Sequence, residues 1–305
     1  MSRSTISTFQ LFEAFPDQET ARLYLESRLW PDGAVCPTCK NKDRITTRKG
    51  GFYRCNPCKL DFTVRTGTIF ERSHVQLHKW IHAMYLLVTA RKGISSTQLA
   101  KQIGITQKSA WFVLHRLREA CANNPTVLSG IVAIDETYVG GKEKNKHNSK
   151  KQKAGRGAVG KTAVLGMRER GGRVKAMPVQ STDMETLSVA VVENVAEGST
   201  IHTDEHSGYQ VLGELGYQHK TISHKDGVYS RRGVTTNGIE SVFAVFKRGI
   251  HGVYHHVSPK HVGRYADEFA FRLNEGNVKV HTFARLDSMI DGASGKRLTF
   301  QRLTA

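Results

Sequence analysis

The spacing of hydrophobic residues changes near residue 130 and divides the chain into two parts. Before this point, apolar residues recur at helical spacing over residues 1–30 and again over residues 75–121. Beyond it, the stretch Ser129–Gly141 contains an apolar, β-branched run that leads to Asp135, and Gly140-Gly141 follow, which is typical of a buried strand and a turn after it. We therefore predict a helical N-terminal part and a mixed α/β C-terminal part, with the boundary in the loop Asn123-Asn124-Pro125.

Residues 75–124 are predicted to contain a helix-turn-helix. After an apolar helix from His78 to Thr89, Ser95 can cap a short helix that Gly104 closes, and Thr106 can cap the next helix. This order describes a helix-turn-helix, although a plain helical hairpin would give the same pattern. In the DNA-binding version, the N-terminal turn of the second helix contacts base edges. The residues that could do so are Gln107, Lys108 and Trp111.

The charge of the chain indicates its partner. Lysine and arginine number 45 against 27 acidic residues, which gives a formal net charge of +18. Such a surplus favours binding to nucleic acid over the alternative that charge serves solubility alone. No apolar run approaches the roughly 18 residues of a membrane span, and the N-terminus lacks the apolar region of a signal peptide. We expect a cytoplasmic, nucleoid-associated protein with reduced cysteines and no membrane partner.

Two C-x-x-C pairs within residues 31–70, with fifteen residues between them, match the knuckles of a zinc ribbon. Because four thiolates complete a tetrahedral shell, the zinc would be structural, and so small a ribbon would need it to fold. Disulfides are the alternative, but a reducing compartment disfavours them. Basic residues that crowd the ribbon, from Lys40 to Arg65, could contact phosphates or form a merely solvated face. The predicted zinc ligands are Cys36, Cys39, Cys55 and Cys58.

The segment Lys142–Lys161 is rich in lysine, glycine and asparagine and has almost no apolar residues. It cannot pack a core, so we expect DNA to order it. The predicted DNA contacts in the C-terminal part are Lys144, Lys146, Lys150, Lys151 and, on a later helix, Arg248.

The remaining elements predict a ribonuclease H-like α/β domain over residues 128–275. A hairpin turning at Gly171-Gly172 should follow the first strand, and an amphipathic helix over Asp183–Ala196 should come next. A strand then ends at Asp204, and a closing helix carries Glu240. This succession of strand, hairpin, helix, strand and closing helix is the order expected of that fold.

Three carboxylates on separate elements are the candidate catalytic centre. Asp135 and Asp204 are predicted to end two neighbouring strands, and Glu240 shares a helix face with Lys247, two turns later. Converging carboxylates suit Mg²⁺, for which Mn²⁺ can substitute. Two such ions, roughly 3.5–4 Å apart, can activate an attacking oxygen and stabilise a leaving one. Phosphoryl transfer needs little more than this positioning and charge neutralisation.

Each aspartate has an acidic neighbour, Glu136 or Glu205. Successive strand residues point to opposite faces, so only one member of each pair should serve, but periodicity alone does not decide which.

The segments Ile134–Lys142, Thr203–Tyr209 and Thr236–Ile250 resemble DDE-type insertion-sequence transposases that carry an N-terminal zinc ribbon and a ribonuclease H-like integrase core. His255–His261 and Arg264–Asn274 resemble the C-terminal signature of the same group. The resemblance runs from about Phe12 to Asn274. It implies that Asp135, Asp204 and Glu240 hold magnesium and that Lys247 is the basic residue beyond the acid. Some members of the group have asparagine where others have an acid, so Asn237 could share or replace the role of Glu240.

These observations predict a DNA transposase that binds terminal inverted repeats and catalyses metal-dependent strand cleavage and transfer into target DNA. Because two ends must be held together, at least a homodimer on double-stranded DNA is expected. The alternatives are a zinc-ribbon regulator with a degenerate catalytic domain and an endonuclease that cuts without joining. The predicted segments are a helical segment (1–30), a zinc ribbon (31–70), a helix-turn-helix region (75–124), a DDE domain (128–275), and a C-terminal tail or small packing arm (276–305).

Overall fold

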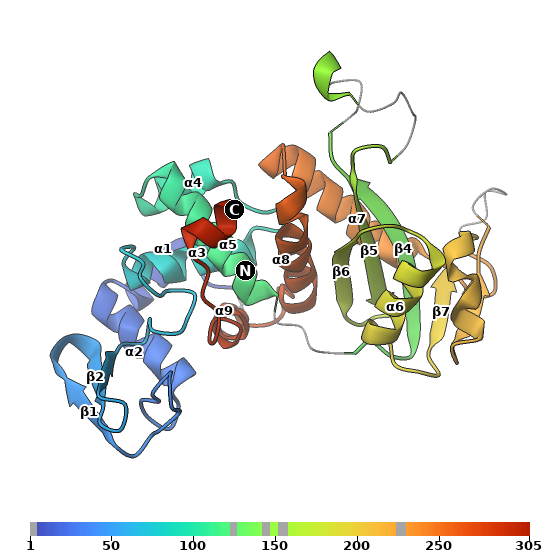
Figure 1. The fold of residues 1–305 in the computed structure, drawn as a ribbon. Helices are drawn as coiled ribbons and strands as arrows, with labels where there is room; N and C mark the ends of the chain where they lie inside the picture. The colour runs from blue at the N-terminus through green and yellow to red at the C-terminus, as the bar shows by residue number, and fades with distance from the viewer. Residues whose placement is uncertain (1–4, 123–126, 142–146, 152–157, 224–229) are drawn as a thin grey trace. The chain divides into compact units, whose positions relative to one another are not determined.

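The computed structural model describes residues 5–122, 127–141, 147–151, 158–223 and 230–305. The chain forms two compact units, shown in Figure 1. The first comprises Met1–Asn123 together with Glu275–Ala305, and the second comprises Asn124–Asn274.

The first unit is built mainly from helices that begin at side-chain caps. Ser7, Asp17, Ser95 and Thr106 each accept a hydrogen bond from a backbone N–H three residues later, which satisfies a donor that the helix itself leaves free. The helices are α1 (Thr8–Ala14), α2 (Gln18–Leu29), α3 (Leu77–Thr89), α4 (Ser96–Ile103), α5 (Gln107–Cys121), α9 (Thr282–Asp291) and α10 (Phe300–Thr304).

Helix α5 passes through the centre of the first unit. Most of its length from Ala110 onward is buried, and its apolar stripe packs as predicted. Even Arg116 is buried, and its guanidinium donates to the carbonyl oxygens of Ile69 and Glu71 at 3.0 and 2.8 Å. Only the first turn of α5, with Gln107 and Lys108, is exposed.

The zinc ribbon is a three-stranded antiparallel sheet in the order β1-β2-β3. It comprises β1 (Ile45–Arg48), the 3₁₀ turn η1 (Lys49–Gly51), β2 (Phe52–Cys55) and β3 (Leu60–Phe62). Strand β3, with three residues, is too short to leave a periodic signal in the sequence.

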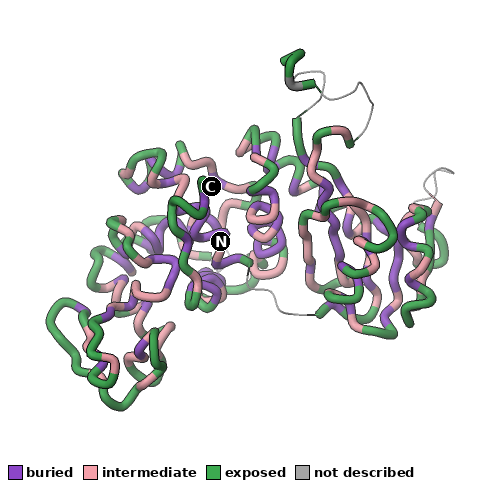
Figure 2. The backbone as a smooth tube through the Cα atoms, in the orientation of Figure 1, coloured by how far each residue is buried: buried purple, intermediate pink, exposed green. Residues whose placement is uncertain are grey.

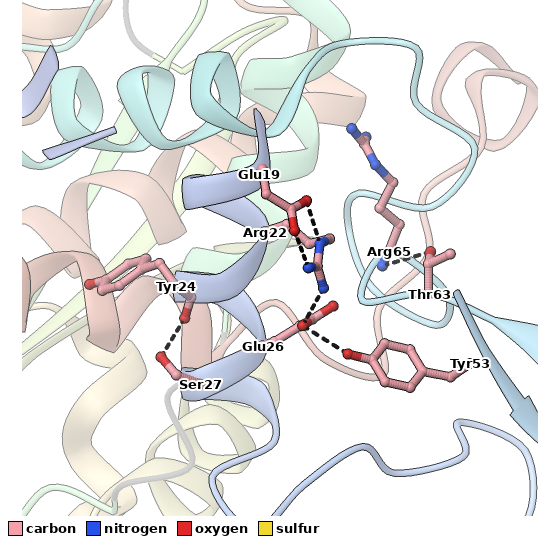
Figure 3. A network of polar contacts seen from close by, with 8 residues as sticks. All are labelled: Glu19, Arg22, Tyr24, Glu26, Ser27, Tyr53, Thr63 and Arg65. Atoms are coloured by element: carbon pink, nitrogen blue, oxygen red, sulfur yellow. Dashed lines mark hydrogen bonds and ion pairs between the residues drawn. The ribbon is translucent and has the colours of Figure 1, made fainter. Parts of the chain in front are cut away.

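Helix α2 anchors the ribbon, as Figure 3 shows. The Glu26 carboxylate accepts hydrogen bonds from Arg22 at 2.6 Å and from the hydroxyl of Tyr53, on β2, at 2.9 Å. Trp30, which follows α2, packs edge-on against Tyr53 and Phe62. The ribbon therefore supplements its small core with contacts to the helix that precedes it.

The C-terminal residues, expected as a tail or packing arm, are part of the first unit. Helix α9 contacts α2, α3 and α5. Beyond it, Leu298 and Leu303 are buried, and the carbonyl of Leu298 accepts a hydrogen bond from buried Arg116 at 3.2 Å. The end of the chain thus completes a core that its first third begins.

The second unit is built on a five-stranded mixed sheet in the order β6-β5-β4-β7-β8. Strands β4, β5 and β6 pair antiparallel, while β4, β7 and β8 pair parallel. This is the arrangement of a ribonuclease H-like domain. The strands are β4 (Ile131–Val139), β5 (Thr162–Glu169), β6 (Val174–Val179), β7 (Thr200–Thr203) and β8 (Gln218–Thr221).

Helices cover both faces of this sheet, so its central strands are buried (Figure 2). On one face, Val132 and Ile134 share a core with Leu187 of α6 (Met184–Asn194) and Tyr209 of the 3₁₀ segment η4 (Ser207–Gly213). On the other face, Val139 packs with residues of two long helices. These helices are α7 (Asn237–Gly249) and α8 (Val262–Glu275).

The remaining short elements are the 3₁₀ turns η3 (Asn148–Lys150) and η6 (Pro259–His261) and the π-helical segment η5 (Ile250–Tyr254).

The predicted position of Asp135 was wrong: this residue lies in the middle of β4, not at its end. The pairing with β5 continues to Val139 because the segment after Asp135 finds partners as far as Thr162. Within the described part of the chain, no helix has the length and apolar character to cross a membrane.

Candidate active site and zinc centre

Asp135 lies on the face of the sheet that α7 covers. Strand residues alternate between faces, and Val139, on the same face of β4, packs with α7 and α8. Glu136 therefore points to the opposite face, where η4 lies. The one contact that links the two neighbours is local: the N–H of Glu136 donates to Asp135 Oδ1 at 2.8 Å.

Asp204 follows directly after β7, as predicted. Its Oδ1 accepts the backbone N–H of His206 at 3.0 Å, which fixes the carboxylate at the start of η4. The neighbouring Glu205 is exposed and accepts a hydrogen bond from Ser223 at 3.0 Å instead. Asp204, not Glu205, is the member of this pair that faces Asp135 closely enough to affect its ionisation.

Glu240 lies in the first turn of α7 and is half-buried. Its Oε1 accepts a hydrogen bond from the hydroxyl of Thr236, the residue that precedes the helix, at 2.8 Å. Asn237 is exposed, and its backbone N–H donates to the hydroxyl of Thr235 at 3.1 Å.

The close approach of α7 to the sheet depends on Gly166. This residue is the cross-strand partner of Asp135 in β5. A Cβ atom there would lie 2.6 Å from Cζ of Phe243 and 2.7 Å from Cδ1 of Ile239, distances at which atoms overlap. Glycine therefore lets the rings and methyl groups of α7 press onto the strand, and this brings Glu240 towards Asp135.

The three carboxylates interact electrostatically. Burial raises the pKa of Asp135 to about 7, and the negative charges of Glu136, Asp204 and Glu240 add to the effect. In the described part of the chain, the close cluster of possible metal ligands is formed by the four ribbon cysteines, so the three acids do not form a comparably close group. A half-buried cluster of like charges favours a cation, and oxygen donors from three parts of the chain suit a hard divalent one.

Glu136 belongs to a different network, which the sequence did not reveal. The hydroxyl of Tyr209, in η4, donates to Glu136 Oε2 at 2.5 Å, and His206 Nε2 lies 3.8 Å from Oε1. Burial and the Glu136 carboxylate both raise the pKa of Tyr209. This phenol therefore keeps its proton and satisfies the carboxylate. The sequence feature that could have indicated this network is Tyr209, which lies within the motif Thr203–Tyr209.

The predicted basic residues differ in how far the structure describes them. Lys247 and Arg248 are exposed in the last turn of α7. Lys151 is exposed and donates to Asn148 at 2.9 Å, while only the backbone of Lys150 is described. Lys144 and Lys146 lie outside the described residues.

In the helix-turn-helix, Gln107 and Lys108 are exposed, and Trp111 is half-buried. Gln107 donates to the hydroxyl of Ser96 in α4 at 2.8 Å. Lys108 Nζ lies 4.8 Å from the centre of the Phe300 ring, and Trp111 contacts the same ring edge-on. The C-terminal helix α10 therefore lies against the turn that was predicted to meet DNA.

The four cysteines of the ribbon converge, with all sulfur atoms within 4.8 Å of one another. Cys39 Sγ and Cys55 Sγ are 3.5 Å apart, close to the roughly 3.8 Å expected between two thiolates that share a tetrahedral zinc. Burial opposes ionisation of Cys36, but the N–H groups of Cys39 and Thr38 outweigh it and lower the pKa of this thiol to about 7. The geometry and the donors fit structural zinc. The fifth cysteine, Cys121, is buried in α5 and is not part of this cluster.

Comparisons with known proteins agree with this architecture. Residues 127–274 match the ISXO2-like transposase domain, and residues 16–61 match the transposase zinc-ribbon domain. A relative from Halobacterium salinarum, described as an uncharacterized protein in transposable element ISH50, is 28% identical over 251 residues, which cover 77% of this chain and 84% of that protein.

Two solved structures are also similar. A chain of the simian T-cell lymphotropic virus intasome, in complex with the PP2A regulatory subunit B56 gamma, shares 15% identity with a TM-score of 0.28. That match covers 65% of this chain and 66%, just under two thirds, of the other. A chain of the Mos1 strand transfer complex shares 12% identity with a TM-score of 0.23, over 62% of this chain and 73% of the other. Both scores are low, so these likenesses carry no weight beside the family matches.

A zinc-ribbon module and a ribonuclease H-like domain of transposase type, joined in one chain, define a transposase. The two matches together cover more than half of the chain. The protein belongs to the family of DDE-type insertion-sequence transposases with an ISXO2-like transposase domain.

Proposed function

We propose that this transposase binds the terminal inverted repeats of an insertion sequence, cuts DNA there and joins the freed ends to target DNA. The observation that carries the proposal is the electrostatic coupling of Asp135 with Asp204 and Glu240 on one face of the sheet. These acids come from β4, from the residue after β7 and from α7, which lie far apart in the sequence, and no packing requirement explains a half-buried group of like charges.

Asp135, Asp204 and Glu240 are the residues that would hold two Mg²⁺ ions, with Mn²⁺ as a substitute. Bound there, the ions would supply activation of the attacking oxygen and stabilisation of the leaving one. The interaction of Glu240 with Asp135, and the exposure of Asn237, favour Glu240 as the third acid.

The chain's own residues position these groups. Thr236 orients Glu240 through its hydroxyl, and the N–H of His206 orients Asp204. Lys247, seven residues after Glu240, lies on the same face of α7 and can contact a phosphate of the bound strand. Tyr209 keeps Glu136 satisfied on the opposite face, so this acid does not compete for the site.

Recognition of the element's ends would fall to the first unit. The exposed first turn of α5 offers Gln107 and Lys108 to the bases, and the ribbon offers a basic surface. The part of that surface free for phosphates is smaller than its sequence suggests, because Arg48 and Arg54 both pair with Asp61 and Arg65 donates to the carbonyls of Ser73 and Val75. Binding two ends requires at least a dimer on DNA, and sizing the protein–DNA complex tests this.

A linear DNA that carries the element's own ends, incubated with Mg²⁺ or Mn²⁺, separates the proposal from its rivals. Joined products support the transposase, and cut products alone would instead indicate an endonuclease. Binding without cutting would indicate a regulator with an inactive catalytic domain.

A further inference from the structure

A cavity of about 190 Å³ opens in the second unit on the face of the sheet that carries the acids. Its lining includes Arg168 and Arg170 at the end of β5, Ala133 of β4, His202 of β7, and Thr235 and Gly238 at the start of α7. None of these residues has a role in the chemistry described above.

For each of the three acids, a residue that lines the cavity lies two positions before that acid in the sequence. Ala133 precedes Asp135 by two residues, and His202 precedes Asp204 by two; a two-residue step keeps the same face and spans roughly 6.7 Å of strand. On α7, Gly238 precedes Glu240 by two residues. On β4 the lining continues the face that carries Asp135, on β7 it precedes Asp204, and Gly238 places it at the N-terminal end of the helix that carries Glu240.

Two guanidinium groups line this cavity. Arg168 donates to the carbonyl of Gly238 at 2.8 Å, and Arg170 donates to the carbonyl of Gly233. Each contact uses one N–H group of the five that a guanidinium carries, so both side chains are held in place with donors to spare. Such fixed, weakly hydrated cations are suited to phosphate.

Further donors face the same space. Thr235 N–H donates to Nδ1 of His202 at 3.3 Å, which leaves the proton of the neutral ring on Nε2. The N-terminus of α7, a helix of thirteen residues, adds the positive end of its dipole beside Gly238. The one acid in the lining, Glu169, is already paired: its oxygens accept the N–H groups of Ser129 at 2.7 Å and Arg173 at 2.9 Å.

We propose that this cavity binds a phosphate of the DNA strand that occupies the active site, adjacent to the phosphate at which the strand is cut. The inference rests on the proposed function, because it takes the strand at the acids to be DNA. Arg170 is the principal contact, since its side chain is exposed and reaches the cavity without being part of the core. Arg168 also supports α7 through Gly238, so it serves less well as a test.

The experiment places a single neutral methylphosphonate at each phosphate around the cut site in a duplex that carries the element's end. At one adjacent position, the neutral group should lower cleavage by the wild-type protein about tenfold, the scale of one charge-assisted contact. In Arg170→Ala the same position should have no further effect, and Arg170→Lys should restore part of the sensitivity. Arg170→Ala should also reduce the slope of log affinity against log salt by about 1.

Lys175→Ala is the matched control. It also removes one positive charge, but Lys175 lies on the other face of the sheet and donates to Asn194 at 3.0 Å. It should leave the methylphosphonate profile unchanged. Two results would show that the cavity is not a phosphate site. Either Arg170→Ala lowers cleavage by the same factor for every methylphosphonate position, or it keeps the full wild-type profile of sensitivity to these positions. If Asp135→Asn still cuts the unmodified duplex, the proposed function itself fails, so the two failures are distinguishable.

Discussion

Asp135 and Gly166 are cross-strand partners in the sheet of the second unit. Because Gly166 has no side chain, α7 can approach the strand, and its approach affects the ionisation of Asp135. Because Ile239 and Phe243 fill the space above Gly166, α7 lies close enough for Glu240 to influence the ionisation of Asp135. The acidic site and the packing of the domain are therefore set by the same pair of strands.

Replacing Gly166 by alanine should separate these two strands from α7. The added methyl would overlap Phe243 and Ile239, so we expect a loss of about 1–3 kcal/mol in the free energy of unfolding, measured with urea, together with a drop in DNA cleavage. Gly213→Ala is the control, since a Cβ there meets nothing within 4 Å. Equal stability of the two variants would contradict the packing argument.

Removing one carboxylate charge should abolish cleavage without affecting binding. Asp204→Asn should lower the rate of strand cleavage roughly a hundredfold or more, because a charge that stabilises the reacting phosphate is lost. Gel-shift affinity for the element's ends should stay near that of the wild type. Glu205→Gln, one residue away but exposed and bonded to Ser223, should keep its activity. An inactive Glu205→Gln variant together with an active Asp204→Asn variant would show that Glu205, not Asp204, is the acid of the active site.

Tyr209→Phe should destabilise the second unit. It leaves the buried oxygen of Glu136 without its 2.5 Å donor, which should cost about 1–3 kcal/mol. Tyr138→Phe provides the comparison, because its hydroxyl is exposed and lies 3.4 Å from Thr182, so its unfolding midpoint should barely move. A Tyr209 variant as stable as the wild type would mean that water or His206 satisfies Glu136 equally well.

The ribbon should lose its metal when two ligands are removed. In a Cys36→Ser, Cys39→Ser variant, zinc measured by atomic absorption should fall from one ion per chain to none, and DNA binding should weaken as the ribbon unfolds. Cys121→Ala, which changes a buried cysteine that is not a ligand, should retain both. Full zinc content in the double variant would place the metal elsewhere.

Residues 276–305 should contribute to the stability of the first unit. Leu298→Ala removes a side chain that is 1% exposed and should cost about 2–5 kcal/mol in thermal or urea unfolding. Leu23→Ala, on the 53% exposed side chain of α2, should change stability by less than about 0.5 kcal/mol. If the two variants had the same stability, residues 276–305 would instead be a tail that does not contribute to the core.

Much of this protein follows from short-range patterns. Caps such as Thr106, the hairpin at Gly171-Gly172 and the strand around Ile134 are local features, because each depends on a few neighbouring residues. The cysteine spacing belongs with them, since two short turns and one metal define a ribbon almost regardless of context.

Tertiary structure decided what depends on residues far apart in the chain. The sequence offered Asp135 and Glu136 as equals, and only the placement of α7 on one face and of Tyr209 on the other separated them. Likewise, residues after Glu275 carry no motif, yet they enter the first unit because Arg116, buried some 180 positions earlier, needs the carbonyl of Leu298. Periodicity determines which residues share one side of a helix or strand. Which side faces a partner is decided by the free energy of packing between elements, and this depends on residues that are distant in the sequence.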